Sequence, residues 1–446
     1  MKLTKTIFAL SLIITAIVGC KDYTVVDTSQ QDNFDNVKVI AEPLVGEAFY
    51  GQDAQHQTTI PAYVDNFDGT VTDKNTGLMW TKTPDLNSDG VINIKDKFSY
   101  DELVIKAEES SAAGYNDWRL PTVKELYSLM NFNGTDISSS AEGDCPVEGE
   151  LPPEGETPPA GEIPSECSGE TLEPQPLVEQ VESRPFIDIN YFDFAYGDIE
   201  AGERQIDSQY ATNTLYIANT ANDGGRTLFG VNFADGRIKG YGLTLFGQDK
   251  VFSAMFVRGR DKPREEYGIN QFNDNKNGTI SDSATKLMWT KDDSLTAMVW
   301  SDALAWVQTK NEESYLGYQD WTLPDAKQLQ SIVDYTRSPD TTDSPAIDPI
   351  FNSSKVVNEA GQDDYPAYWT STTHINTSTM PGGPAVYINF GRAMGFMNGG
   401  WVDVHGAGSQ RSDPKVGNPE DFPEGFGPQG DAIRINNHLR MVRTIK

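Results

Sequence analysis

Gly114-Tyr115-Asn116-Asp117-Trp118-Arg119-Leu120-Pro121 is the stretch that decides the fold, because the second half of the chain repeats it as Gly317-Tyr318-Gln319-Asp320-Trp321-Thr322-Leu323-Pro324. At equal offsets, Lys124-Glu125-Leu126 follows the first copy and Lys327-Gln328-Leu329 follows the second. A motif that recurs with its flanking residues indicates an internal repeat of one structural unit.

Four further landmarks recur in the same order on either side of this stretch. They are Asp68 to Asp73 with Asn277 to Asp282, Thr76 to Lys82 with Thr285 to Lys291, Val231-Asn232-Phe233 with Ile388-Asn389-Phe390, and Phe256-Val257-Arg258 with Met441-Val442-Arg443. We therefore predict a tandem duplication with units at 62–260 and 268–446.

Each unit is expected to be an α+β domain. Asp-Gly or Asn-Gly between β-branched residues predicts a hairpin, and the Leu-Met-Trp that follows predicts a buried strand. Apolar residues at helical spacing predict helices over 100–109 and 300–310. Leu-Pro followed by Thr122 or Asp325 predicts a second helix start with an oxygen cap. The result is two helices against a twisted, mostly antiparallel sheet.

The two units differ in their insertions. Unit one carries an acidic, Pro-rich segment at 137–180, and unit two carries a Gly-rich segment at 398–437. Long loops on a repeated scaffold are where function is usually located.

Composition excludes some partners. The net charge of −31 repels phosphate backbones and anionic headgroups, which argues against nucleic acid and against direct binding to an anionic membrane. Aromatic residues form 10% of the chain and include eight Trp, so we expect a packed protein.

The N-terminus predicts a lipid anchor. Lys2 and Lys5 precede an apolar run from Ile7 to Val18, which is shorter than the ~20 residues of a membrane span. Gly19-Cys20 then matches a bacterial lipobox, so residues 1–20 are expected to be a lipoprotein signal peptide with a lipidated Cys20. An ordinary signal peptide with an incidental cysteine is the alternative.

The residues after the cysteine predict where the protein resides. Lys21 follows Cys20 where the usual sorting rule of Gram-negative cells would need Asp for inner-membrane retention, so the outer membrane is favoured, on its periplasmic or outer face. Residues 21–61 are polar and are expected to form a tether that holds the domains off the membrane.

Cys145 and Cys167 are the remaining cysteines of the three in the chain. Both lie in the Pro-rich segment, and an oxidising compartment permits a disulfide between them. We favour that disulfide over two free thiols.

Asp85 to Asp96 predicts a calcium loop. Asp85, Asn87 and Asp89 supply side-chain oxygens at positions 1, 3 and 5, with Gly at position 6, the Val91 carbonyl at 7 and Asp96 at 12. A polar loop that joins a strand to a helix is the alternative. Unit two has only Asp292-Asp293-Ser294 at this place, so one calcium ion is expected.

Two further acidic patterns are expected to be structural. The turns Asp65 to Gly69 and Asn273 to Gly278 look like metal sites, but Asx turns explain them equally well. The Asp117-Trp118 and Asp320-Trp321 pairs are expected to place a carboxylate on backbone and an indole in the core.

Catalytic signals are weak. The four histidines show no metal-ligand spacing, and the chain contains no G-x-S-x-G or H-E-x-x-H motif. His405 lies near Asp403, Ser409, Arg411 and Asp413, which permits a hydrolase interpretation, although a solvated loop is favoured.

A ligand face on unit two is the preferred interpretation of the same region. We expect Tyr387, Arg392, Trp401, His405 and Arg411 to be exposed there. Aromatic rings stack on sugars and arginine pairs with anionic groups, so glycans or extracellular proteins are the expected ligands.

The repeated landmarks resemble the Lcl C-terminal domain family, named for the Legionella collagen-like adhesin. The resemblance also includes Ile187-Asp188 to Phe192, Ile347-Asp348 to Phe351, and Tyr-Trp-Thr-Ser-Thr-Thr at Tyr368 to Thr373. It covers 62–260 and 268–446. Unit one departs from the pattern at Tyr210 to Thr214, where Trp369 has no counterpart.

Trp118-Arg119-Leu120-Pro121-Thr122 also resembles a segment of the formylglycine-generating-enzyme branch of C-type-lectin-like folds. This resemblance implies two tandem C-type-lectin-like domains. The enzymes of that branch use cysteine chemistry, and no free cysteine lies near this region. We therefore expect a non-catalytic, adhesin-like or lectin-like surface lipoprotein, with a structural envelope component as the alternative and a hydrolase as the least favoured.

Overall fold

The computed structural model describes residues 23–138, 181–220, 225–245, 247–259 and 267–445. Cys20, Cys145 and Cys167 therefore lie outside the described residues. Within those residues, no helix is long and apolar enough to cross a membrane.

The duplication appears as two four-stranded antiparallel sheets with the same strand order. Unit one has the order β13-β5-β4-β3 and unit two has β24-β16-β15-β14. The strands are β3 (Tyr63–Asp65), β4 (Thr70–Asp73), β5 (Leu78–Thr81), β13 (Val257–Gly259), β14 (Phe272–Asp274), β15 (Thr279–Asp282), β16 (Leu287–Thr290) and β24 (Val442–Thr444). Trp80 pairs with Val257 and Trp289 pairs with Val442, and both indoles are fully buried. The hairpin and Leu-Met-Trp predictions are confirmed in both units.

The predicted helices are also present. The first is α1 (Tyr100–Glu109), and its partner α3 (Trp300–Glu312) runs two residues beyond the expected end. Thr122 caps α2 (Val123–Tyr127) and Asp325 caps α4 (Ala326–Ser331), each by accepting the N–H of the third helical residue. Both caps are reciprocal, because Glu125 or Gln328 accepts the N–H of the capping residue in return.

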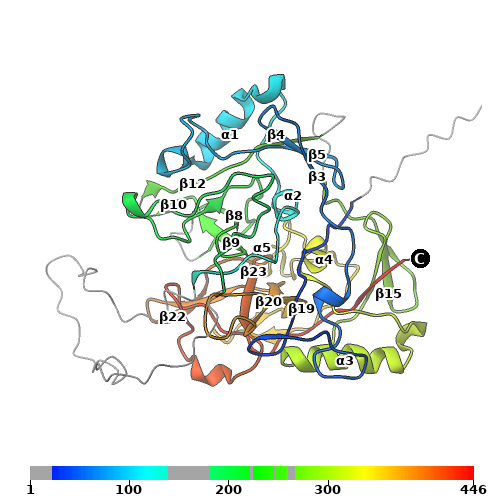
Figure 1. Cartoon of the computed structure of the whole chain (residues 1–446). Helices are drawn as coiled ribbons and strands as arrows, with labels where there is room; N and C mark the ends of the chain where they lie inside the picture. Colours follow the sequence, from blue (N-terminus) through cyan, green and yellow to red (C-terminus); the bar gives the residue numbers. More distant parts are fainter. Residues whose placement is uncertain (1–22, 139–180, 221–224, 246, 260–266, 446) are drawn as a thin grey trace, which may run out of the picture.

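A six-stranded sheet joins the two units into one body. Its order is β19-β20-β23-β9-β8-β7, so three strands of unit two continue into three strands of unit one (Figure 1). The strands are β7 (Gln209–Tyr210), β8 (Thr227–Asn232), β9 (Arg237–Gly242), β19 (Ala367–Thr373), β20 (Pro384–Asn389) and β23 (Gln410–Pro414). The antiparallel contact of Gln410 with Ile238 makes the connection. One hydrophobic cluster runs through both units as a result, and each unit has in addition a smaller cluster of its own, around Trp118 in unit one and around Trp321 in unit two.

Helices α2 and α4 pack against each other beside this sheet and exchange lysines. Nζ of Lys124 donates to the carbonyl of Ser331 at the end of α4 (2.7 Å). Nζ of Lys327 donates to the carbonyl of Ser128 just after α2 (2.9 Å). Each lysine therefore satisfies a helix-end carbonyl of the other unit, which is the contact pattern of a two-fold axis.

The region where unit one departs from the family pattern keeps one backbone contact of unit two. Ala211 donates to the Ser253 carbonyl as Trp369 donates to the His438 carbonyl. Ala211 thus occupies the place of Trp369, but it lies outside β7, which has two residues where β19 has seven.

The prediction that residues 21–61 form a polar tether is wrong for the described part. Residues 23–61 pack on the body, with Val26 and Phe34 each 1% exposed. The amide of Gln30 donates to the Thr373 carbonyl and accepts the Thr373 N–H. This segment covers β19, which is an edge strand whose backbone groups would otherwise face solvent.

The prediction that 398–437 is a single insertion also needs correction. Its residues 410–414 form β23, an inner strand of the six-stranded sheet. The additional structure of unit two has two parts. The first is the hairpin of β21 (Met394–Met397) and β22 (Gly400–Asp403), which precedes β23. The second is the loop that follows β23. In unit one the chain turns directly from β8 into β9.

Smaller elements complete the described fold. They are β1 (Asn33–Phe34), β2 (Val39–Ile40), β6 (Phe98–Ser99), β10 (Thr244–Leu245), β11 (Gln248–Asp249), β12 (Val251–Phe252), β17 (Val356–Val357), β18 (Asp363–Asp364) and α5 (Pro339–Thr342).

Candidate functional site

The hairpin β21–β22 is the part of the sheet region that unit two has and unit one lacks. Asn398 and Gly399 form its two-residue turn, and both have positive φ, of 53° and 81°. Two consecutive residues with positive φ are the requirement of a type I′ turn, whose twist matches that of the strands. The Asn-Gly dipeptide therefore determines where this hairpin forms.

Aromatic side chains gather on this hairpin and on the loop beside it. Phe396 and Trp401 lie across the hairpin with ring centroids 5.4 Å apart. Phe422 and Phe426 in the loop 418–431 form a second pair, with centroids 6.3 Å apart. Phe426 is 47% exposed, and the other three rings are half-buried. We call these four residues the aromatic ridge.

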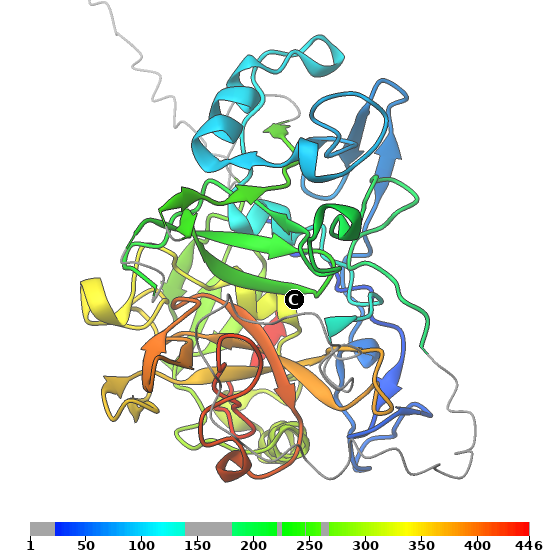
Figure 2. The same cartoon turned by 90° about the vertical axis from the view of Figure 1, so that its left-hand side faces the viewer.

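The loop is held to the hairpin by backbone contacts. The N–H of Phe396 donates to the Gly430 carbonyl (2.8 Å), and Gly395 forms a bridge with Asp431. Figure 2 shows the hairpin in orange and the loop in red on the same face of the molecule. The two segments that carry the ridge residues are thus held side by side by their backbones.

A buried polar cluster lies under the ridge. Nη2 of Arg411 bonds to Asp431, and Nη1 of Arg411 lies 2.8 Å from Nε2 of His405. The same His405 nitrogen is 2.9 Å from the Asp431 carboxylate. Arg411 is 8% exposed and His405 is 2% exposed. These contacts fix Asp431, and with it the end of the ridge loop.

Burial controls the protonation of this cluster. Burial, together with the charge of Arg411 and against the opposing charge of Asp431, lowers the pKa of His405 to about 4, so the imidazole is neutral. Burial alone would raise the pKa of Asp431, but Arg411 and His405 hold it well below its usual range. Burial raises the pKa of Asp413 to about 6.

The space beside these residues is small. A cavity of about 10 Å³ is lined by Tyr387, Asn389, Ala393, Met394, His405, Arg411, Asp431, Ala432 and Arg434. This volume is close to the minimum for a single water molecule. A ligand the size of a sugar would therefore not fit in this cavity.

The predicted ligand residues are brought together, but three of the five are buried and the prediction that they are exposed is wrong for those. Tyr387 is on β20 and faces Arg411 on β23, and both strands are inner strands. His405 follows β22 and is covered with them. Trp401 is half-buried, on the ridge.

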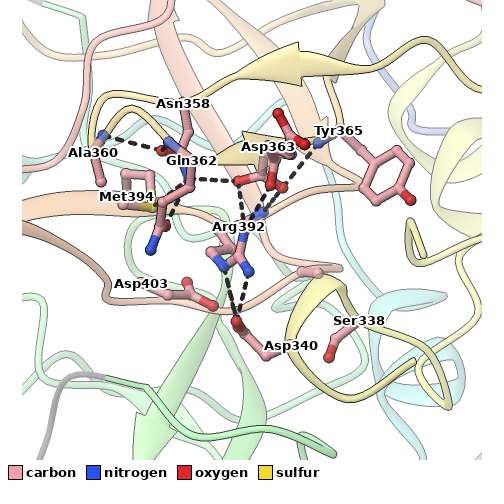
Figure 3. A network of polar contacts seen from close by, with 12 residues as sticks. Ser338, Asp340, Asn358, Ala360, Gln362, Asp363, Tyr365, Arg392, Met394 and Asp403 are labelled. Carbon is pink, nitrogen blue, oxygen red and sulfur yellow. Dashed lines mark hydrogen bonds and ion pairs between the residues drawn. The ribbon is translucent and has the colours of Figure 1, made fainter. Parts of the chain in front are cut away.

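Arg392 is held by contacts with other residues of the fold, Asp340 and Asp364 (Figure 3). Its guanidinium binds both carboxylate oxygens of Asp340, with a shortest distance of 2.6 Å, and its backbone N–H donates to Asp364. Asp364 in turn accepts from Asn358 (2.9 Å). Arg392 thus joins α5, β18 and the start of the hairpin, and its side chain is 13% exposed.

The grouping expected for a hydrolase does not form. The hydroxyl of Ser409 donates to the Gly406 carbonyl (2.8 Å), and Asp403 accepts N–H groups from Ala393 and Gly406. Of that grouping His405 contacts Arg411, and its carboxylate partner is Asp431. Asp431, Phe422 and Phe426 were missed as site residues because they lie far along the chain in a Gly- and Pro-rich loop without periodicity.

The predicted calcium loop has the turns of such a loop, with all its acids engaged by backbone. Asp85 accepts N–H groups from Asp89 and Gly90, and Asp96 accepts from Asn87 and Asn93. Gly90 has a φ of 86°, as the sharp bend requires. Among the residues that the structure describes, no group of three or more His, Cys, Asp or Glu could hold a metal ion.

The hairpin turns are stabilised by lysines. Lys82 binds Asp65 (2.7 Å) and Lys291 binds Asp274 (2.8 Å). The hydrogen bond from Lys82 lowers the pKa of Asp65. Both turns contain the expected Asx turn, in which Asp65 accepts the N–H of Phe67 and Asp274 accepts the N–H of Lys276.

The Asp-Trp pairs are structural, with a partner that was not anticipated. Asp117 binds Arg258 and Asp320 binds Arg443, each through two oxygens. The indoles of Trp118 and Trp321 are buried and donate to backbone carbonyls. The repeated Val-Arg landmark thus closes each unit onto its Asp-Trp pair.

A comparison with family models agrees with the repeat. The model of the Lcl C-terminal domain matches residues 69–252 and again 278–404. No curated protein and no solved structure matched the chain.

Proposed function

Because the chain belongs to the Lcl C-terminal domain family, with two matched copies, we propose that it is a non-catalytic binding protein of the bacterial cell envelope. In this proposal the aromatic ridge of unit two binds a glycan or an extracellular protein. The lectin-like character implied by Trp118 to Thr122 is part of the proposal.

The ridge is the observation that supports this function. It combines two aromatic pairs with an exposed acidic rim of Glu420, Asp421 and Glu424. Ring faces stack on the apolar faces of sugars, while carboxylates accept hydrogen bonds from hydroxyl groups. The cluster of Arg411, His405 and Asp431 holds the ridge in place, which limits the entropy lost when a ligand binds.

Glycan and matrix-protein arrays test this proposal. Trp401→Ala with Phe426→Ala should abolish binding of the soluble mature protein to the ligand that the arrays identify. Phe67→Ala is the matched control, because Phe67 is a 92% exposed aromatic residue on a hairpin of unit one. Equal binding by all variants would exclude the ridge as the ligand site.

A structural envelope component is the second candidate, favoured by the continuous sheet through both units. A rigid body of this kind suits a scaffold. Cross-linking in cells should then capture a fixed envelope complex, and the ridge variants should leave that complex intact.

The anchor is part of the same proposal. Cys20 carries lipid and the protein resides at the outer membrane. Cys20→Ala should release the protein from membranes into the soluble fraction, and mass spectrometry of the wild-type N-terminus should detect acyl chains. A disulfide between Cys145 and Cys167 is proposed alongside, and should resist thiol alkylation until reduction.

We also propose calcium binding at Asp85 to Asp96, supported by the spacing of the oxygens and the bend at Gly90. Millimolar calcium should raise the melting temperature, since an ion that binds only the folded state stabilises it. Asp85→Ala with Asp89→Ala should remove the increase. A wild-type protein without any shift would show that the backbone hydrogen bonds alone shape this loop.

A further inference from the structure

The first described residue of the mature chain is already packed into the body. Tyr23 is 4% exposed, and its N–H donates to the Ala284 carbonyl in the turn after β15 (3.1 Å). Its ring lies edge-on to Tyr267 at 4.7 Å, and the Tyr267 hydroxyl donates to the carbonyl of Thr24. The chain therefore enters the body at a defined place, between the turn that follows β15 and Tyr267, which directly precedes unit two.

Three residue steps separate Cys20 from Tyr23. A fully extended chain gains at most about 3.6 Å per residue, so Tyr23 lies within roughly 11 Å of Cys20. The lipid of an acylated Cys20 is in the bilayer, which places the cysteine at the level of the headgroups. We infer that the face around Tyr23 lies directly against the membrane that holds the anchor, so that the body has a fixed orientation. This inference rests on the proposed lipidation.

The composition of this face agrees with contact to lipid headgroups. Ile60 is 68% exposed and Ile269 is 44% exposed. Ile60 follows Thr59, which accepts the N–H of Asp27, and Ile269 lies two residues after Tyr267. Both are thus fixed beside the N-terminal segment. Exposed apolar side chains on a face that touches the membrane can enter the headgroup region at little cost in free energy.

Two exposed lysines belong to the same face. Lys286 is in the turn that binds Tyr23, and Lys74 is in the corresponding turn of unit one, where the neighbouring Asn75 donates to the Ile60 carbonyl. The acids of these turns, Asp73 and Asp282, are fully buried. In a protein of net charge −31, an end that exposes lysines and buries the acids of the same turns is repelled less by an anionic surface than the charge of the whole chain would suggest.

This orientation gives the aromatic ridge a direction. β22, which carries Trp401, and β15, which leads into the turn that binds Tyr23, lie on opposite sides of the molecule (Figure 1). The ridge therefore points away from the membrane, toward whatever ligand approaches.

Short-range fluorescence quenching tests the orientation. The acylated protein, with Cys145→Ser and Cys167→Ser, receives one fluorophore at Ser283→Cys near Tyr23 or at Val402→Cys on β22. It is reconstituted into vesicles of phosphatidylethanolamine and phosphatidylglycerol that carry nitroxide headgroups. We expect strong quenching at position 283 and little at 402. A Gly-Ser spacer inserted after Asp22 should reduce the quenching at 283, because a longer connection frees the body.

Further variants separate contact from proximity. Ile60→Ser with Ile269→Ser should lower the quenching at 283, while Ile199→Ser, at a 61% exposed residue elsewhere, should leave it unchanged. Mass spectrometry verifies acylation before each measurement. An acylated protein quenched equally at 283 and 402 would overturn the orientation alone. An unacylated Cys20 would overturn the anchor and this inference together, without any bearing on ligand binding at the ridge.

Discussion

Lys327 is a buried residue that makes several hydrogen bonds in the contact between the units. It is 4% exposed, and burial lowers its pKa to about 8. Nζ donates to the carbonyls of Ser128 and Asp27, so it ties α4 both to unit one and to the N-terminal segment. Each of these carbonyls would be left without a donor if the lysine were removed.

We predict that Lys327→Met lowers the free energy of unfolding by about 1–3 kcal/mol for each carbonyl left unpaired. Urea denaturation followed by tryptophan fluorescence measures the change. Lys74→Met is the control, because that lysine is exposed. Similar values for the two variants would contradict the role assigned to Lys327.

The buried carboxyl of Asp413 predicts that the stability of the protein depends on pH. Burial raises its pKa from 3.8 to about 6, so the folded protein keeps a proton that the unfolded chain loses. The contribution of the Asp413 carboxyl to the free energy of unfolding is therefore fully present below pH 4 and is lost as the pH rises toward 6. His405 acts in the opposite direction, because its pKa falls from 6.5 to about 4 and stability is lost as the pH falls through that window.

Asp413→Asn isolates the first contribution. The stability of the variant relative to wild type should increase between pH 4 and 6, by roughly 1.4 kcal/mol per pKa unit, and then level off. Denaturation series at several pH values measure this difference. A flat difference across this pH range would show that the Asp413 carboxyl is ionised in the folded protein.

At the scale of elements, the turn Asn398-Gly399 controls the ridge. Gly399 has a φ of 81° and open space around the position of a Cβ, so a side chain there meets backbone strain alone. We predict that Gly399→Val costs about 1–2 kcal/mol locally and weakens ligand binding, with faster amide exchange in β21 and β22. Gly400→Val is the matched control, because it is equally open and needs no positive φ. Equal exchange in the two variants would contradict the prediction.

Elements with regular patterns were predictable from sequence, whereas elements held by polar contacts were not. Apolar spacing located α1 and α3, and Asp-Gly or Asn-Gly located the first hairpins. β23 was missed because Gln410 to Pro414 has no apolar alternation: its buried side chains include Arg411 and Asp413, which are paired with other polar groups.

The same reason explains the N-terminal segment and the site. Val26 and Phe34 are isolated apolar residues in polar sequence, so nothing in their spacing indicated burial. Trp401 was correctly placed on the unit-two insertion. Its neighbours Phe422 and Phe426 come from a loop whose position depends on Asp431 contacting Arg411, and such long-range contacts leave no local signal.

For the whole molecule, the shared sheet predicts one folding unit. One core cluster contains residues of both units, beside a smaller cluster in each unit, and β9 and β23 would be exposed edge strands in the separate halves. The full chain should unfold in a single calorimetric transition with equal calorimetric and van't Hoff enthalpies. Residues 62–260 or 268–446 expressed alone should be unfolded or aggregated. Two independent transitions would show that the halves are autonomous.

The exchanged lysines of α2 and α4 also bear on ancestry. A contact in which each half offers the other the same residue is self-complementary, so a gene encoding one copy would produce chains that pair symmetrically. Fusion of two such genes makes that pairing intramolecular and independent of concentration. It also allows the sequences of the two copies to diverge. One descendant could then acquire an acidic excursion and the other a protruding hairpin, while the axis between them stayed as it was.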